Sequence, residues 1–155
     1  MAFASKAGTH GARQPGGRAL RMVNAFLARR IRKGGGRAMG LDTLLLITVG
    51  AKSGQTRETP LARFDAPDGG WYVVASANGA RRNPAWYHNI AAHPDAVRVV
   101  VAGRELGVAA EQISGTERDQ VWQRICTEQP RFGKYGTRTD REIPIIRLVP
   151  VASAT

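Results

Sequence analysis

The stretch between residues 44 and 89 constrains the fold most, because three short strand patterns follow one another there with only brief polar turns between them. An uninterrupted apolar run at residues 44–49 predicts a buried strand, and residues 58–64 and 71–75 predict two more. The first turn, at residues 50–57, reads Gly-Ala-Lys-Ser-Gly-Gln-Thr-Arg, and the second reads Pro-Asp-Gly-Gly. This stretch therefore predicts a sheet of short strands.

Further strand patterns follow towards the C-terminus. Residues 96–102 predict a half-exposed strand with valines on one face and Arg98 on the other, and residues 105–113 predict its hairpin partner. Residues 143–149 predict the last strand. About six mostly antiparallel strands with peripheral helices predict a mainly β, α+β domain in the form of a small barrel.

Helices are expected outside this sheet. Residues 84–92 predict a short helix with proline in its first turn, and a second helix is predicted from an N-cap at Thr116 onward. Residues 129–139 are expected to form a loop. None of these segments is long and apolar enough for a membrane span of about 20 residues.

An amphipathic helix is predicted before the barrel, at residues 18–33. Leu20, Val23, Leu27 and Ile31 recur at helical spacing, and Phe26 widens their stripe. Arginines and a lysine fill most of the other positions, and three glycines at residues 34–36 end the helix.

Charge divides the chain unevenly. Its 155 residues carry a formal net charge of +11, and residues 1–40 contain nine basic residues and no acidic one. Residues 1–17 are rich in Gly and Ala, which predicts disorder. We therefore expect a basic, partly disordered N-terminal arm at residues 1–39, a barrel domain at residues 40–150, and a short tail at residues 151–155.

The basic helix leaves two interpretations open. It can lie on an anionic membrane surface, where each basic residue contributes about 1 kcal/mol, or it can pack on the barrel with a solvated basic face. Nucleic-acid binding is not expected, because the arm shows no recognised module. The single cysteine, Cys126, excludes an internal disulfide framework and favours a reducing cytoplasm. Peripheral attachment to the inner face of the cell membrane is the option that the basic helix adds.

Several common site types are excluded by spacing. In a P-loop, Lys-Ser or Lys-Thr follows the glycine and leads into a helix. Here Lys-Ser precedes Gly54, and a strand follows, so residues 50–54 are not a P-loop. His88 and His93 have no third partner with metal-ligand spacing, so no metal site is predicted. Ser53 and Ser76 lack a nucleophile elbow. Any enzyme chemistry would therefore come from an organic cofactor.

Three motifs stand in one order along the chain. They are residues 48–57 with 59–61, residues 83–89, and Tyr135 followed by residues 138–144. Together they resemble the signatures of the deazaflavin (coenzyme F420)-dependent nitroreductase family, over about residues 40–150. The resemblance implies a split β-barrel of the flavin and deazaflavin oxidoreductase superfamily, related to flavin-binding reductases and pyridoxamine-phosphate oxidases. It also implies an enzyme like the nitroreductases and quinone reductases.

The resemblance also implies a role for each matching residue. Lys52, Ser53 and Arg57 would hold the phosphate of the cofactor tail. Tyr135 and Ser76 would be the catalytic pair, with Tyr135 over the ring on the substrate side, and Phe132 would be a wall of the substrate pocket. The whole cofactor-binding set implied in this way is Ala51, Lys52, Ser53, Arg57, Glu58, Thr59, Pro60, Leu61, Ala62, Val74, Ala75, Ser76, Ala77, Ala85, Trp86, Tyr87, His88, Asn89 and Tyr135.

One position departs from the family pattern. Ala51 stands where the family commonly has an arginine, and Arg81 or Arg82 would be the replacement.

The implied activity is hydride transfer from reduced deazaflavin to a small electrophilic acceptor. The acceptor would be a quinone, a conjugated enone or a nitroaromatic. One alternative is the same barrel binding FMN as a reductase or oxidase. Another is a non-catalytic protein that binds a cofactor or a membrane surface. Whether two copies pair as a homodimer is left open.

Overall fold

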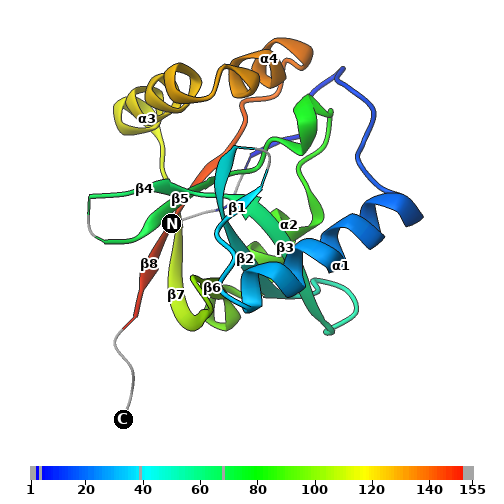
Figure 1. Ribbon diagram of the computed structural model, residues 1–155. Helices are drawn as coiled ribbons and strands as arrows, with labels where there is room; N and C mark the ends of the chain where they lie inside the picture. The colour runs from blue at the N-terminus through cyan, green and yellow to red at the C-terminus, as the bar shows by residue number, and fades with distance from the viewer. Residues whose placement is uncertain (1–2, 4, 39, 68, 152–155) are drawn as a thin grey trace.

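Strand β2 (Leu41–Val49) lies at the centre of the fold, because its residues 43–48 are all buried and it pairs with three other strands. The computed structural model describes residues 3, 5–38, 40–67 and 69–151 (Figure 1). Its helices are α1 (Arg18–Arg32), α2 (Ala85–Ala92), α3 (Gly115–Glu128) and α4 (Pro130–Arg138), with 3₁₀ turns η1 (Ala77–Gly79) and η2 (Pro94–Ala96). The other strands are β1 (Arg37–Ala38), β3 (Thr56–Ala62), β4 (Phe64–Asp65), β5 (Trp71–Val74), β6 (Arg98–Val101), β7 (Arg104–Gln112) and β8 (Ile145–Pro150).

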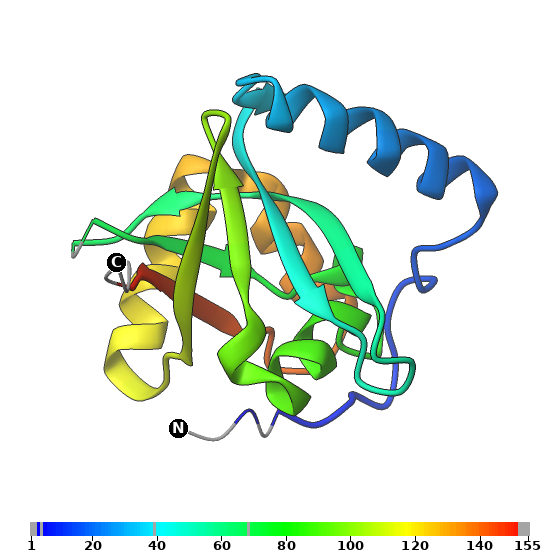
Figure 2. The ribbon, with the colours of Figure 1, turned by 90° about the horizontal axis from the view of Figure 1, so that it is seen from below.

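The strands form one curled sheet. Every pairing between the strands named above is antiparallel, in the order β1-β2-β6-β7-β8-β5-β4, with β3 on β2. The sheet curls into a half-barrel with helices outside it (Figure 2). The predicted α+β split barrel is thus confirmed. The described residues form two strands more than the six expected, because β1 and β4 are extensions of two residues each.

Two apolar clusters fill the two sides of the curled sheet. Burying apolar side chains is the main favourable term in folding, and the two clusters take alternate residues of β5 and β8. The first packs α2 against the sheet through Leu44, Leu46, Val73, Ala75, Trp86, Tyr87, Ile90, Val99, Ile146 and Leu148. The second lies against α3 and α4 and contains Phe64, Tyr72, Val74, Ile113, Ile125, Phe132 and Ile145.

Helix α1 packs on the barrel through its C-terminal half only. Ala28 and Ile31 are buried with Leu45, Ile47 and Val100. The prediction of a half-exposed β6 was therefore wrong: Val100, on the face assigned to solvent, is only 2% exposed because α1 covers it. The N-terminal half of α1 extends past the sheet (Figure 2) and leaves its apolar residues exposed.

The N-terminal strap, residues 5–14, lies along the barrel where the composition predicted disorder. The N–H of Gly8 donates to the Arg81 carbonyl at 2.8 Å, and the N–H of Ala12 donates to the Gly79 carbonyl at 2.9 Å. These backbone bonds order a segment that buries little apolar surface. Residues 1, 2, 4 and 152–155 lie outside the described residues, and the division into arm, barrel and tail stays a prediction.

Two boundaries near the C-terminal helices differ from the prediction. Residues 129–139, expected to be a loop, contain α4, which begins at Pro130 in the first-turn position that proline favours. Two glycines inside this helix hid its pattern, because glycine lowers helix propensity. Helix α3 has Ser114 at its N-cap position rather than Thr116.

Candidate active site

A cleft of about 510 Å³ opens where the turn between β2 and β3 meets the start of α2. Two of the three sequence motifs therefore come together in space, although about 30 residues separate them along the chain. The cleft is lined by Gly50, Ala51, Lys52, Ser53, Arg57, Glu58, Thr59, Ala85, Trp86, His88 and Asn89.

The β2–β3 turn is closed by its own backbone. The N–H of Gly50 donates to the Gln55 carbonyl at 2.7 Å, and the N–H of Gly54 donates to the Gly50 carbonyl at 3.0 Å. The hydroxyl of Ser53 accepts from the N–H of Gln55 at 3.1 Å. Lys52 and Arg57 are exposed on this fixed turn, so two cations and a hydroxyl meet at the mouth of the cleft.

Asn89 fastens the turn to α2. Its side-chain oxygen accepts from the Ala51 N–H at 2.9 Å, and its side-chain nitrogen donates to the Thr48 hydroxyl at 3.1 Å. Both Asn89 and Thr48 are buried. Asn89 was predicted to face the ring of the cofactor. In the structure its side chain sets the position of the turn that carries Lys52.

Neighbouring residues of α2 point in different directions. Trp86 lines the cleft and also packs into the barrel core. Tyr87 is 1% exposed, and its hydroxyl accepts from the Ser5 N–H at 3.0 Å and donates to the Gln112 side chain at 2.6 Å. The structure thus brings Trp86 to the cleft and places Tyr87 in the core, bonded to the strap.

Of the β3 residues that were predicted to bind the cofactor, some line the cleft and others lie beyond it. Thr59 lines the cleft, whereas residues 60–62 follow it along β3, half-buried beside β2. Glu58 lines the cleft and also accepts a hydrogen bond from Arg32 of α1. This bond raises the pKa of the Arg32 guanidinium and joins α1 to the edge of the site.

The predicted ring-facing residues lie beyond this cleft, where β5 ends. Val74 and Ala75 are buried, one in each apolar cluster, and the chain then turns through half-buried Ser76 and Ala77. Tyr135 lies close by: α4 contacts η1, and a β-carbon on Gly79 would lie 2.6 Å from the Tyr135 carbonyl.

Phe132 lies in the second apolar cluster, and the two candidate replacement arginines line a hollow of their own. Phe132 is 6% exposed and packs edge-on against Phe64 and Tyr135 at ring distances of 5.5 and 5.4 Å. It supports Tyr135 from within the second cluster. Arg81 and Arg82 line a separate hollow with strap residues 10–12 and 14, away from the cleft that Ala51 lines.

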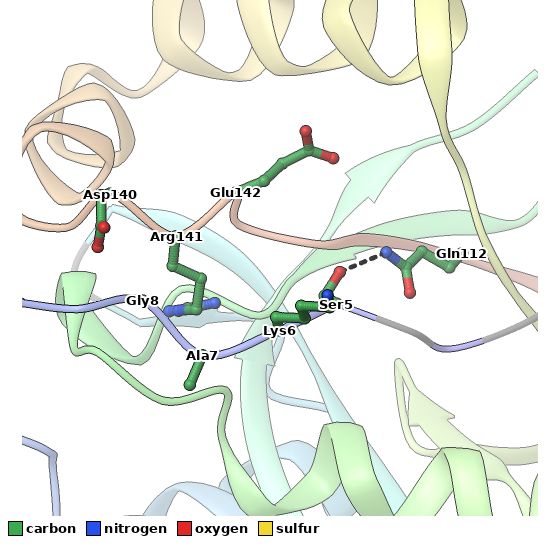
Figure 3. Close-up of a pocket in the computed structure, with 8 residues that line it drawn as sticks. All are labelled: Ser5, Lys6, Ala7, Gly8, Gln112, Asp140, Arg141 and Glu142. Atoms are coloured by element: carbon green, nitrogen blue, oxygen red, sulfur yellow. Dashed lines mark hydrogen bonds between the residues drawn. The ribbon is translucent and has the colours of Figure 1, made fainter.

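One residue with a large structural role has no sequence signal of its own. Arg141 was part of the third motif but had no predicted function. It is buried behind the end of β5, where it also lines a hollow of about 430 Å³ together with strap residues 5–8 (Figure 3). Burial lowers the pKa of its guanidinium.

The described residues set limits on other site types. They contain no group of three His, Cys, Asp or Glu side chains that could hold a metal ion. None of their helices is long and apolar enough to cross a membrane.

The donor set of the cleft fits a phosphate-bearing ring cofactor. Lys52, Arg57 and the Ser53 hydroxyl offer charge-assisted and neutral hydrogen bonds to phosphate oxygens. Trp86 and Ala85 supply apolar surface next to them. The cleft is of the size usual for cofactor sites.

Comparison with known proteins decides the family. A model of the F420H(2)-dependent quinone reductase family matches residues 19–150. The chain belongs to this family. A Mycobacterium tuberculosis protein named F420H(2)-dependent quinone reductase is 40% identical over 110 residues, covering 68% of this chain and 72% of its own. A second, putative quinone reductase of that organism is 33% identical over 120 residues, covering 77% and 99%.

Solved structures agree with this membership. A structure of an F420-H2 dependent reductase is 36% identical with a TM-score of 0.61, covering 68% of this chain and 92% of its own. Another, described as a domain-swapped dimer, is 32% identical with a TM-score of 0.62, covering 84% and 99%. The predicted enzyme class and its dependence on F420 are confirmed. The FMN-binding and non-catalytic alternatives find no support.

Proposed function

We propose that this F420-dependent oxidoreductase reduces a quinone, with the cleft between the β2–β3 turn and α2 as its cofactor site. The observation that carries the proposal is that Lys52, Ser53 and Arg57 share one cleft with the indole of Trp86. Membership in the quinone reductase family favours a quinone over the enone and nitroaromatic acceptors.

Each part of the site has a distinct task in this proposal. Lys52, Ser53 and Arg57 bind the phosphate, Ala51 and residues 58–62 line the tail, and Ala85 with Trp86 packs beside the ring. Residues 74–77 form the ring face opposite. Because both cations lie at the β2–β3 turn and the indole of Trp86 lies on α2, the phosphate and the ring are bound at different parts of the cleft.

When bound in its reduced form, F420 supplies the hydride. The protein holds the acceptor near the ring and supplies a hydrogen bond to the oxygen on which negative charge develops. Tyr135 and Ser76 are the proposed donors. Tyr135 is held by Phe132 beneath it and by Arg138, whose guanidinium carbon lies 5.6 Å from the centre of the phenol ring.

The test combines binding with turnover. Purified protein is titrated with oxidised F420 and, as the control, with FMN, and the quenching of tryptophan fluorescence is followed. Reduction of a soluble quinone by F420H2 is then measured for the wild type and for Tyr135→Phe. We expect preference for F420, quinone reduction, and a kcat lower by about 10²-fold in the variant. Equal binding of both cofactors without turnover would contradict the proposal.

We further propose that the protein attaches to an anionic membrane surface on its cytoplasmic side through α1. Met22, Val23 and Phe26 are exposed, Phe26 by 59% and Met22 by 67%, and they lie among the basic residues of the helix. Apolar side chains flanked by cations are the pattern of interfacial helices.

Vesicle flotation tests this attachment without removing α1, which covers Val100. Full-length protein is compared with a Met22→Ser/Val23→Ser/Phe26→Ser variant on vesicles with and without anionic lipid. We expect the wild type alone to float, and only with anionic lipid. A wild type that stays in solution with both vesicle types would end this proposal.

A homodimer is also proposed, because a solved relative is described as a domain-swapped dimer. Light scattering coupled to size exclusion measures the mass in solution, and the mass of one chain at all concentrations would exclude it.

A further inference from the structure

Arg141 is a buried arginine at the meeting point of three chain segments. It is 5% exposed, and its guanidinium donates four hydrogen bonds. Nε donates to the Ala80 carbonyl at 3.1 Å, and Nη2 to the Ser76 carbonyl at 2.9 Å. Nη1 donates both to the Ala75 carbonyl at 3.0 Å and to the Asn83 side-chain oxygen. One side chain thus joins the end of β5 to the start of α2.

The acceptors of Arg141 are all neutral. Among the described residues no ion pair joins it to a carboxylate: Asp140 and Glu142 beside it are exposed, and Asp140 binds Thr9 of the strap. An arginine stays charged even when buried, so its placement costs desolvation energy that an apolar side chain would avoid. Arg141 therefore contributes to the fold through its directed hydrogen bonds rather than through the volume that its side chain fills.

The backbone that Arg141 holds is unusual. Ala77, Asn78 and Gly79 follow one another with φ of 45°, 57° and 80°, a left-handed run that side chains on Ala and Asn disfavour. The bonded carbonyls flank this run, those of Ala75 and Ser76 before it and that of Ala80 after it. Such a conformation persists only where its surroundings fix it, and it is typical of functional sites.

The bonds also decide where two backbone donors point. In a trans peptide the C=O and N–H groups point in opposite directions, and the described chain has no cis peptide. Because the Ala75 and Ser76 carbonyls point to Arg141, the N–H groups of Ser76 and Ala77 point away from it. Asn83, held by the same guanidinium, leads directly into the residues of α2 that line the cleft.

We propose that Arg141 is a positioning residue that fixes the Ser76 peptide and the start of α2 relative to each other. The inference rests on the proposed function, in which residues 74–77 face the cofactor ring. Arg141 would then align these residues with the cleft between the β2–β3 turn and α2. The strap closes over the residue from outside: its side chain extends to the strap beside Gly8 (Figure 3), and the Asn83 side chain donates to the Ser5 carbonyl at 3.2 Å.

The test replaces Arg141 by lysine, which keeps the charge. A single ammonium cannot reach acceptors that one guanidinium contacts through three nitrogens. Hydrogen exchange at residues 76–80 should speed up about tenfold, since their local opening becomes easier. We expect kcat for quinone reduction to fall on the order of 10²-fold through misalignment, with KM for F420H2 unchanged because the phosphate contacts remain.

Arg147→Lys is the matched control. Arg147 lies on β8 and pairs with Glu111 and Glu117, neither of which belongs to the joint at residues 75–83. Hydrogen exchange at residues 76–80 and kcat for quinone reduction in Arg147→Lys should match those of the wild type. Asn83→Ala removes one of the four acceptors and should shift both readouts in the same direction by a smaller factor, and it serves as the deciding variant if Arg141→Lys does not fold.

The outcomes separate the inference from the function on which it rests. Unchanged exchange at residues 76–80 and unchanged kcat in Arg141→Lys, or in Asn83→Ala where that variant decides, would overturn it. So would a loss of kcat equal to that of Arg147→Lys. If the wild type itself reduces no acceptor with F420H2, the proposed function fails, while the exchange comparison still decides whether Arg141 holds the joint.

Discussion

The turn at residues 50–57 and the joint at residues 75–83 serve the same proposed cofactor but are built in opposite ways. In the turn, Lys52 and Arg57 are exposed, and the backbone closes on itself. In the joint, the cation is the buried Arg141, whose guanidinium donates its hydrogen bonds to protein groups of residues 75–83. The first region presents charge to a ligand, and the second uses charge to hold a shape.

This difference predicts how each region fails. Exposed cations stabilise a fold little, because solvent screens them, so their removal should cost affinity and leave stability intact. A buried joint contributes to both stability and alignment, so changes there should appear in denaturation and in kcat before they appear in cofactor affinity.

The largest expected effect is on binding at the turn. Replacing Lys52 and Arg57 together by alanine should weaken F420 binding about 10³-fold, since each charge-assisted hydrogen bond contributes about 1.5–3 kcal/mol. The urea midpoint should stay at its wild-type value. Arg104→Ala, on the exposed β6–β7 hairpin, is the control for removing a surface arginine. Wild-type affinity in the double variant would move the phosphate site elsewhere.

A glycine-to-alanine pair compares the rigidity of the two regions directly. Gly54 in the turn and Gly79 in the joint both have left-handed φ, of 70° and 80°. A β-carbon on Gly54 meets nothing within 4 Å, whereas one on Gly79 lies 2.6 Å from the Tyr135 carbonyl and 2.9 Å from the Arg138 side chain.

Chemical denaturation should therefore separate the two variants. Gly54→Ala should cost about 1 kcal/mol of unfolding free energy through backbone strain alone. Gly79→Ala adds overpacking against α4 and should cost about 3 kcal/mol. Equal losses would show that α4 moves aside freely and that the joint is no more rigid than the turn.

Asn89 is the place where the turn depends on buried bonds. Asn89→Ala leaves the Ala51 N–H and the buried Thr48 hydroxyl without their partner, so we expect a loss of about 2 kcal/mol in the free energy of unfolding. His88→Ala, at the exposed neighbouring position, should stay within about 0.5 kcal/mol. If Asn89→Ala is as stable as His88→Ala, the turn is held by its own backbone alone.

The sequence allowed the turn to be predicted but not the joint. Lys52, Ser53 and Arg57 stand in a local pattern, a polar turn directly after a buried strand, so the turn itself follows from neighbouring residues. Their role in phosphate binding is implied by the family resemblance. The roles of Trp86 and Tyr87 depend on the rotation of a short helix against the sheet. Adjacent helical residues point about 100° apart, and only the packed structure shows which of them meets the cleft.

The joint depends on contacts between distant segments. Arg141 bonds residues that precede it by 58 to 66 positions, and no periodicity in the sequence reports such a pairing. The strap was hidden for the same reason: its composition predicts disorder, and backbone bonds to Gly79 and Arg81 order it. Helix α4 was hidden by Gly133 and Gly136, although Phe132 and Tyr135 have helical spacing.

The smallest expected effect concerns the link between the strap and Asp140, the residue directly before Arg141. The hydroxyl and the N–H of Thr9 donate to the Asp140 carboxylate at 2.6 and 2.7 Å, which lowers the pKa of Asp140 from 3.8 to about 2. His10 also contributes, through its backbone N–H, and its ring nitrogen lies 4.0 Å away. Since the folded-state pKa is depressed, the link stabilises the fold fully above pH 3.8, and this stabilisation is lost as the pH falls through about 2.

Asp140→Asn should remove this pH dependence. The difference in urea midpoint between the wild type and the variant should be small, because the site is exposed. It should be constant above pH 3.8 and should shrink towards zero as the pH falls through about 2. Thr9→Val keeps the carboxylate but removes the hydroxyl donor, so the pKa of Asp140, followed by NMR, should return towards 3.8. A midpoint difference that does not shrink between pH 3.8 and about pH 2 would mean that Asp140 acts through packing. The strap would then be held to the joint by its backbone bonds and by the Thr139 hydroxyl, which donates to the His10 carbonyl at 2.7 Å.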